Sequence, residues 1–91
     1  MENFKILDCG NYFTIVNVEG KEENHAHVKR RSTAELLVRL VKNKRVPDSS
    51  YLRTSAKRLT LSTKYIRDIN IKIGKDKSKQ SYYNKNNNNI R

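Results

Sequence analysis

The sequence predicts a small α+β domain: an N-terminal antiparallel β-meander of two or three strands, then two helices, then a third short helix or a closing strand. Two observations carry this prediction. β-Branched and aromatic residues cluster between turn-forming stretches in the first third of the chain, and apolar residues then recur at helical spacing. Neither pattern continues beyond residue 73. We therefore expect one domain over residues 1–73 and a disordered, basic, Asn- and Lys-rich tail over residues 74–91.

The strands are expected at residues 4–8, 12–18 and 25–29, with polar turn signals between them. Side chains alternate between the two faces of a strand. In the second strand this places Phe13, Ile15 and Asn17 on one face and Thr14, Val16 and Val18 on the other. Both sets contain apolar side chains, so we expect both faces of the sheet to be at least partly covered.

The clearest helix follows the strands. Ala34, Leu37, Val38 and Val41 stand at positions i, i+3, i+4 and i+7, which form one apolar face. Ser32-Thr33-Ala34-Glu35 has the spacing of a capping box, which predicts the start of the helix at Ser32. Val46 and Pro47 are expected to end it.

A second helix is predicted from the N-cap candidates Asp48, Ser49 and Ser50 to about Arg58. Its spacing places Leu52, Ala56 and Leu59 on the inner face and Arg53 and Lys57 on the outer face.

Residues 59–73 fit two structures. The strict alternation over residues 69–73 is typical of a half-buried strand, whereas Ile66, Ile69 and Ile73 would share one face of a helix that starts at Ser62. A short helix to Ile69 followed by a terminal strand satisfies both patterns.

Charge is distributed unevenly along the chain. Residues 1–28 hold five acids and two lysines, whereas residues 29–91 hold eighteen Lys or Arg and only four acids. Ordinary surfaces intersperse both signs, so this excess indicates a polyanionic partner, with nucleic acid favoured over an anionic membrane. Phosphate contacts supply affinity without sequence preference. We expect them from Arg39, Lys42, Lys44, Arg45, Arg53, Lys57 and Arg58.

Residues 52–69 resemble a helix-turn-helix. Ala56 is small enough to let two helices approach, Ser62 can cap the second, and a small core is expected from Leu59, Leu61, Ile66 and Ile69. The sequence departs from the usual pattern at Thr60, where the turn commonly has Gly, and at Ser55, where an apolar residue is common. The resemblance implies duplex DNA as the partner. It also implies that Thr63, Lys64 and Arg67 project into the major groove, with Tyr65 nearer the DNA backbone.

A second hypothesis is a non-enzymatic interaction module or inhibitor that docks on an acidic protein, with residues 69–73 as a strand edge for β-augmentation. The tail leaves a similar choice open. Its lysines and the pair Tyr82 and Tyr83 suit phosphate contacts and stacking on unpaired bases, or simply solubility.

No catalytic constellation is evident, so we expect no enzyme activity and no cofactor. The glycines are scattered rather than gathered in a phosphate-binding loop, and the acids of the basic part are dispersed. Cys9, His25 and His27 could hold zinc only if the strands bring them together, and no fourth ligand is evident, so we expect no metal.

The single cysteine excludes an internal disulfide. The chain has neither the pattern of a signal peptide nor an apolar run long enough to span a bilayer. These features predict a cytoplasmic protein, and the Asn- and Lys-rich composition fits a low-GC bacterium, its phage or a mobile element.

Overall fold

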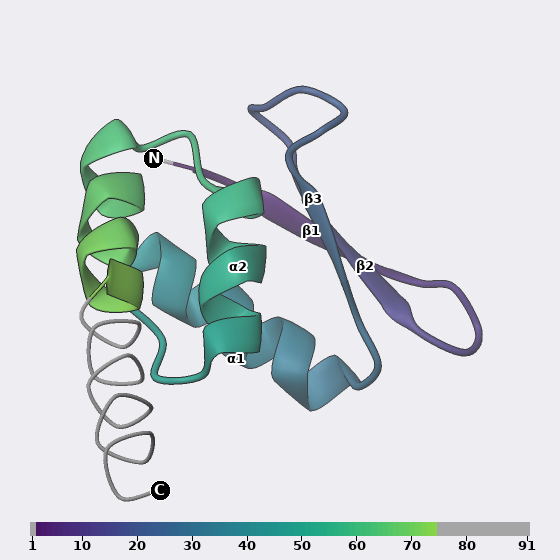
Figure 1. Cartoon of the computed structure of the whole chain (residues 1–91). Helices are drawn as coiled ribbons and strands as arrows, with labels where there is room; N and C mark the ends of the chain where they lie inside the picture. The colour runs from purple at the N-terminus through teal and green to yellow at the C-terminus, as the bar shows by residue number, and fades with distance from the viewer. Residues whose placement is uncertain (1, 75–91) are drawn as a thin grey trace, which may run out of the picture.

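The computed structural model describes residues 2–74 and confirms the α+β class (Figure 1). Strands β1 (Phe4–Asp8), β2 (Phe13–Asn17) and β3 (His25–Val28) form an antiparallel sheet in the order β1-β2-β3. Helices α1 (Arg31–Lys42) and α2 (Ser50–Leu59) follow, and a third helix spans residues 63–74. Apart from Gly74, the predicted tail lies outside the described residues.

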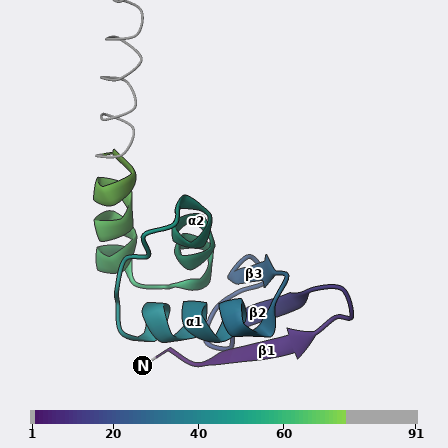
Figure 2. The ribbon, with the colours of Figure 1, turned by 90° about the horizontal axis from the view of Figure 1, so that it is seen from below.

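Helices α1 and α2 pack against one face of the sheet. The strand register pairs Ile15 with Ile6 on one side and with Ala26 on the other, so these side chains share a face. Ile15, Ala26 and Val28 are buried in one core with residues of all three helices. On the opposite face, Thr14 and Val16 remain half-buried. The third helix lies beyond α2, on the side away from the sheet (Figures 1 and 2).

The start of α1 differs from the prediction. Its N-cap is Arg30, which makes no side-chain capping bond, so Ser32 lies inside the first turn and the predicted capping box is wrong. Only Lys29 and Arg30 separate β3 from α1, so the chain enters the helix before Ser32. The predicted inner face is confirmed at Ala34, Leu37 and Val41, which are fully buried.

The end of α1 also comes earlier than Val46 and Pro47. The helix ends at Lys42, and Lys44 adopts a left-handed backbone conformation with φ of 56°. The Arg45 N–H donates to the Leu40 carbonyl (2.9 Å), and the Lys44 N–H donates to the Val41 carbonyl (3.2 Å). This is a Schellman motif, which stops the helix by satisfying its last carbonyls before the proline is reached.

Residues 63–74 are helical throughout, so of the two predicted alternatives the helix is confirmed and the closing strand over residues 69–73 is not formed. The Ser62 hydroxyl accepts the Tyr65 N–H (3.2 Å), which confirms Ser62 as the cap. Tyr65 and Ile69 are buried and Ile73 is half-buried, whereas Ile71 is 53% exposed. The helical spacing therefore decides which isoleucines reach the core, and no strand edge is left here for β-augmentation.

Candidate nucleic-acid interface

α2, residues 60–62 and the third helix have the connectivity of the predicted helix-turn-helix. Ala56, Leu59 and Ile69 are fully buried between the elements, as expected. Leu61 is 44% exposed instead of lying in this core, whereas Tyr65 is buried in it. In Figures 1 and 2 the third helix runs back alongside α2, as in an αα-hairpin. The face of the third helix that points away from α2 is consequently on the outside of the molecule.

This outer face carries the residues predicted to read bases. Thr63, Lys64 and Arg67 are all exposed. Lys64 and Arg67 are three residues apart, so they are neighbours on one side of the helix. The three side chains are thus brought together on one accessible surface.

Tyr65 does not lie near that surface, and its predicted place beside a DNA backbone is wrong. The side chain is 1% exposed, and its hydroxyl donates to the Arg45 carbonyl (2.6 Å). Burial, together with the negative charge of Glu2, raises the pKa of the Tyr65 hydroxyl to about 12. Tyr65 therefore fixes the third helix to the loop between α1 and α2.

The predicted phosphate contacts divide into exposed and internal groups. Five side chains are exposed and one, Lys57, is half-buried. The exposed ones are Arg39, Lys42, Lys44, Arg45 and Arg58. Arg53 is only 3% exposed, and its Nη1 donates to the carbonyls of Pro47 (3.1 Å) and Asp48 (2.6 Å). Its predicted outward position is wrong, since it stands three residues before Ala56 on the inner face of α2 and holds the preceding loop.

Lys44 is accessible, but its ammonium group is used within the protein. Its Nζ lies 2.8 Å from Glu2 Oε1, donates to the Val41 carbonyl (3.2 Å), and stands 5.8 Å from the centre of the Tyr65 ring. Because the carboxylate of Glu2 neutralises this charge, Lys44 offers less to a phosphate than an unpaired lysine would.

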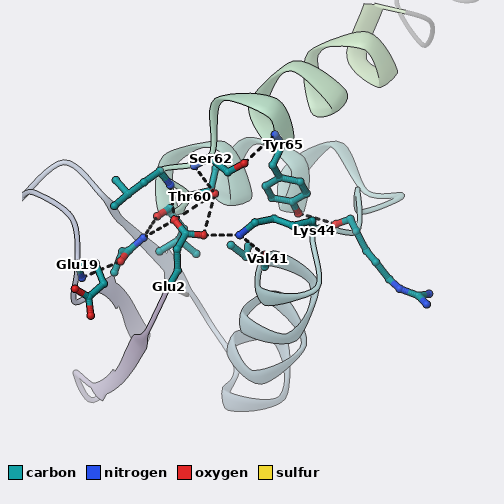
Figure 3. A network of polar contacts seen from close by, with 11 residues as sticks. Glu2, Glu19, Val41, Lys44, Thr60, Ser62 and Tyr65 are labelled. Atoms are coloured by element: carbon teal, nitrogen blue, oxygen red, sulfur yellow. Dashed lines mark hydrogen bonds and ion pairs between the residues drawn. The ribbon is translucent and has the colours of Figure 1, made fainter.

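Glu2 is the centre of this polar cluster (Figure 3). Besides Lys44, its carboxylate accepts hydrogen bonds from Asn17 Nδ2 (3.0 Å), Thr60 Oγ1 (3.1 Å) and the Leu61 N–H. Burial by itself would raise the pKa of Glu2, but the hydrogen bonds from Lys44, Leu61 and Thr60 hold it below its ordinary value of 4.5. The cluster ties the turn of residues 60–62 to β2 and to the end of α1.

Thr60 takes the place of the usual glycine because the turn has no need of one. Its φ of −82° is ordinary extended backbone, and its hydroxyl accepts the Ser62 N–H (3.1 Å) while it donates to Glu2. Sequence analysis missed the roles of Glu2 and Asn17. The sequence offered one signal for Asn17, because strand alternation places this polar side chain on the same face as Phe13 and Ile15.

Within residues 2–74, no group of three or more His, Cys, Asp or Glu side chains is arranged to hold a metal ion. Cys9 Sγ and His27 Nδ1 instead both contact the Thr14 hydroxyl, at 3.3 and 3.0 Å. None of the helices in that part of the chain combines the length and the hydrophobicity needed to cross a bilayer. Comparison of the chain with protein-family models, with curated proteins and with solved structures finds no match.

Proposed function

We propose that this protein is a non-enzymatic, cytoplasmic nucleic-acid-binding protein whose favoured partner is duplex DNA. The observation that carries the proposal is the exposed pair Lys64 and Arg67, on a helix whose opposite face is anchored by buried Tyr65 and Ile69. A helix held rigidly by its inner face, with cations on its outer face, suits insertion into a major groove. Thr63 adds a hydroxyl that can pair with a base or a phosphate.

Cations near the third helix would supply the phosphate contacts. Arg45 is linked to this helix because its carbonyl accepts the hydrogen bond from the Tyr65 hydroxyl. Lys42 is the last residue of α1, three residues before Arg45. The other candidate phosphate contacts lie on α1 and α2, where Arg39 and Arg58 are exposed and Lys57 is half-buried. A regulatory or accessory factor of a phage or mobile element would be consistent with this size and charge.

The test is fluorescence anisotropy of the full chain with random duplex DNA over a salt series. We expect duplex affinity to fall steeply with salt, and the variant Lys64→Glu with Arg67→Glu to lose about tenfold or more. A matched control, Lys5→Glu with Lys21→Glu, makes the same change in net charge at exposed positions on β1 and in the β2–β3 loop. It should stay within about threefold of wild type, because only non-specific attraction changes.

Equal losses in both variants would mean that net charge alone drives binding, and would contradict the third helix as the contact. Absence of binding to any nucleic acid at physiological salt would overturn the proposal and favour the acidic protein partner instead.

A further inference from the structure

Three hollows follow one another across α1, the start of α2 and the end of β3. The first, of about 550 Å³, lies along α1 and is bounded by Leu36. The second, of about 490 Å³, extends from Leu36 to Tyr51. The third, of about 350 Å³, lies on the other side of Tyr51 and reaches His27 on β3. Leu36 separates the first two hollows and Tyr51 separates the last two, and the row of three hollows is here called the cationic groove.

The walls of the cationic groove carry five basic side chains and no carboxylate. The five are Lys29, Arg30, Arg39, Arg45 and Arg58. All are exposed, and none forms an ion pair within the part of the chain that the structure describes. The hollow beside residues 60–62 is different, since Glu2 and Glu19 line it together with Lys44. The positive charge of the groove is therefore uncompensated by the fold.

Tyr51 stands in the middle of the groove and is both exposed and held in position. Its side chain is 56% exposed, and its hydroxyl donates to the His27 carbonyl (2.7 Å). An aromatic ring fixed before binding loses little conformational entropy when a ligand stacks on it. Leu36, which is 39% exposed, adds an apolar surface at the opposite end of the same hollow.

We propose that the cationic groove binds an unpaired segment of nucleic acid, with its phosphates on the basic walls and a base stacked on Tyr51. The sugar-phosphate backbone is the polyanion that a line of unpaired cations attracts. In a duplex the faces of the bases are hidden by stacking, so only an unstacked base can reach the face of Tyr51. The inference rests on the proposed function in that both require nucleic acid, but Tyr51, Lys29 and Arg30 are separate from the third helix.

The experiment measures binding of a single-stranded oligothymidylate of about 12 nucleotides, a length within the range of single-strand sites. We expect Tyr51→Ala to weaken binding about 5- to 160-fold, since stacking on an aromatic side chain contributes about 1–3 kcal/mol per base. Tyr51→Phe keeps the ring and should stay within about threefold, because only the hydroxyl bond is lost. Lys29→Glu with Arg30→Glu should weaken binding and reduce its salt dependence. Thermal unfolding followed by circular dichroism verifies that each variant is folded.

The variant Tyr82→Ala with Tyr83→Ala is the control, because these two tyrosines could also stack on bases. If this variant loses single-strand affinity and Tyr51→Ala does not, the inference is overturned. If Tyr51→Ala acts as expected but Lys64→Glu with Arg67→Glu leaves duplex binding intact, single-strand binding in the groove is supported and duplex contact by the third helix is contradicted. The reverse pattern supports duplex contact by the third helix and overturns single-strand binding in the groove. If neither the duplex nor the oligothymidylate binds, both proposals are overturned.

Discussion

The Glu2 cluster and the cationic groove show two different uses of charge in one small domain. In the cluster, Lys44 lies 2.8 Å from a carboxylate that also accepts bonds from Asn17 and Thr60. In the groove, the basic side chains have no carboxylate partner within the described residues. The Glu2 side chain is only 12% exposed, and a carboxylate so far removed from water needs partners, whereas an exposed charge needs none. Charges of the first kind maintain the fold, and those of the second kind are available to a partner.

This difference qualifies the formal net charge of +11 as a guide to function. Lys44 is neutralised by Glu2, which comes from the acidic first third of the chain, and Arg53 is enclosed by the protein. The acidic residues of the first third are therefore not all remote from the basic surface. Removing an internal cation and an exposed cation in separate variants tests the distinction directly.

The largest expected effect comes from comparing two arginines of α2. Arg53→Ala should lower the free energy of unfolding by about 2–4 kcal/mol, because it removes buried side-chain volume and leaves the Pro47 and Asp48 carbonyls without these donors. Arg58→Ala, at an exposed position, should change it by less than about 0.5 kcal/mol. Urea denaturation followed by far-UV circular dichroism measures both. Similar values for the two variants would contradict the assignment of Arg53 to the interior.

The same pair should behave oppositely in single-strand binding. Arg58→Ala removes a cation from the groove and should weaken oligothymidylate binding by roughly threefold, with a smaller salt slope. Arg53→Ala, measured at a temperature where it remains folded, should leave the affinity nearly unchanged. A loss of affinity for folded Arg53→Ala alone would show that exposure in the free protein does not identify the contacts.

Sequence reasoning predicted the order of the elements well because that order depends on local patterns. The turn signals delimited the three strands, and the spacing of Ala34, Leu37 and Val41 defined the core face of α1. Residues 69–73 were ambiguous because their isoleucines satisfy both periods. The cap at Ser62 and the burial of Tyr65 favour the helix in the structure. Such packing depends on the whole fold, so the local sequence does not reveal it.

The candidate site was predictable only in part. The exposed cations of the third helix follow from helical spacing, as Lys64 and Arg67 show. The burial of Arg53 could have been suspected, because it stands at i−3 from Ala56 on the predicted inner face. The contacts of Glu2 join residues that are 15 to 59 positions apart in the chain, and no local pattern reveals such pairs.

A smaller effect is expected on breaking the Glu2 cluster. Glu2→Gln should lower the free energy of unfolding at neutral pH by about 1–3 kcal/mol, since it weakens several charge-assisted hydrogen bonds. The pKa of Glu2 is lowered below 4.5 in the folded protein, so its ionised carboxylate stabilises the fold. This stabilisation is complete above pH 4.5 and is lost as the pH falls through the lowered pKa. The difference between wild type and Glu2→Gln should therefore shrink below pH 4.5. A constant difference over that range would contradict the pairing.

The smallest effect is expected at Lys44, where two contributions oppose each other. Its positive φ costs about 1 kcal/mol relative to glycine, and its partly exposed ion pair with Glu2 returns at most about 1 kcal/mol. Lys44→Gly should therefore leave the free energy of unfolding within about 0.5 kcal/mol of wild type, whereas Lys44→Ala keeps the strain, loses the pair and should cost about 1 kcal/mol. In a Glu2→Gln background, Lys44→Gly should become stabilising, because strain relief then has little to oppose it. If Lys44→Gly is instead equally destabilising in both backgrounds, the ion pair is not the reason that the fold tolerates a lysine in a left-handed conformation.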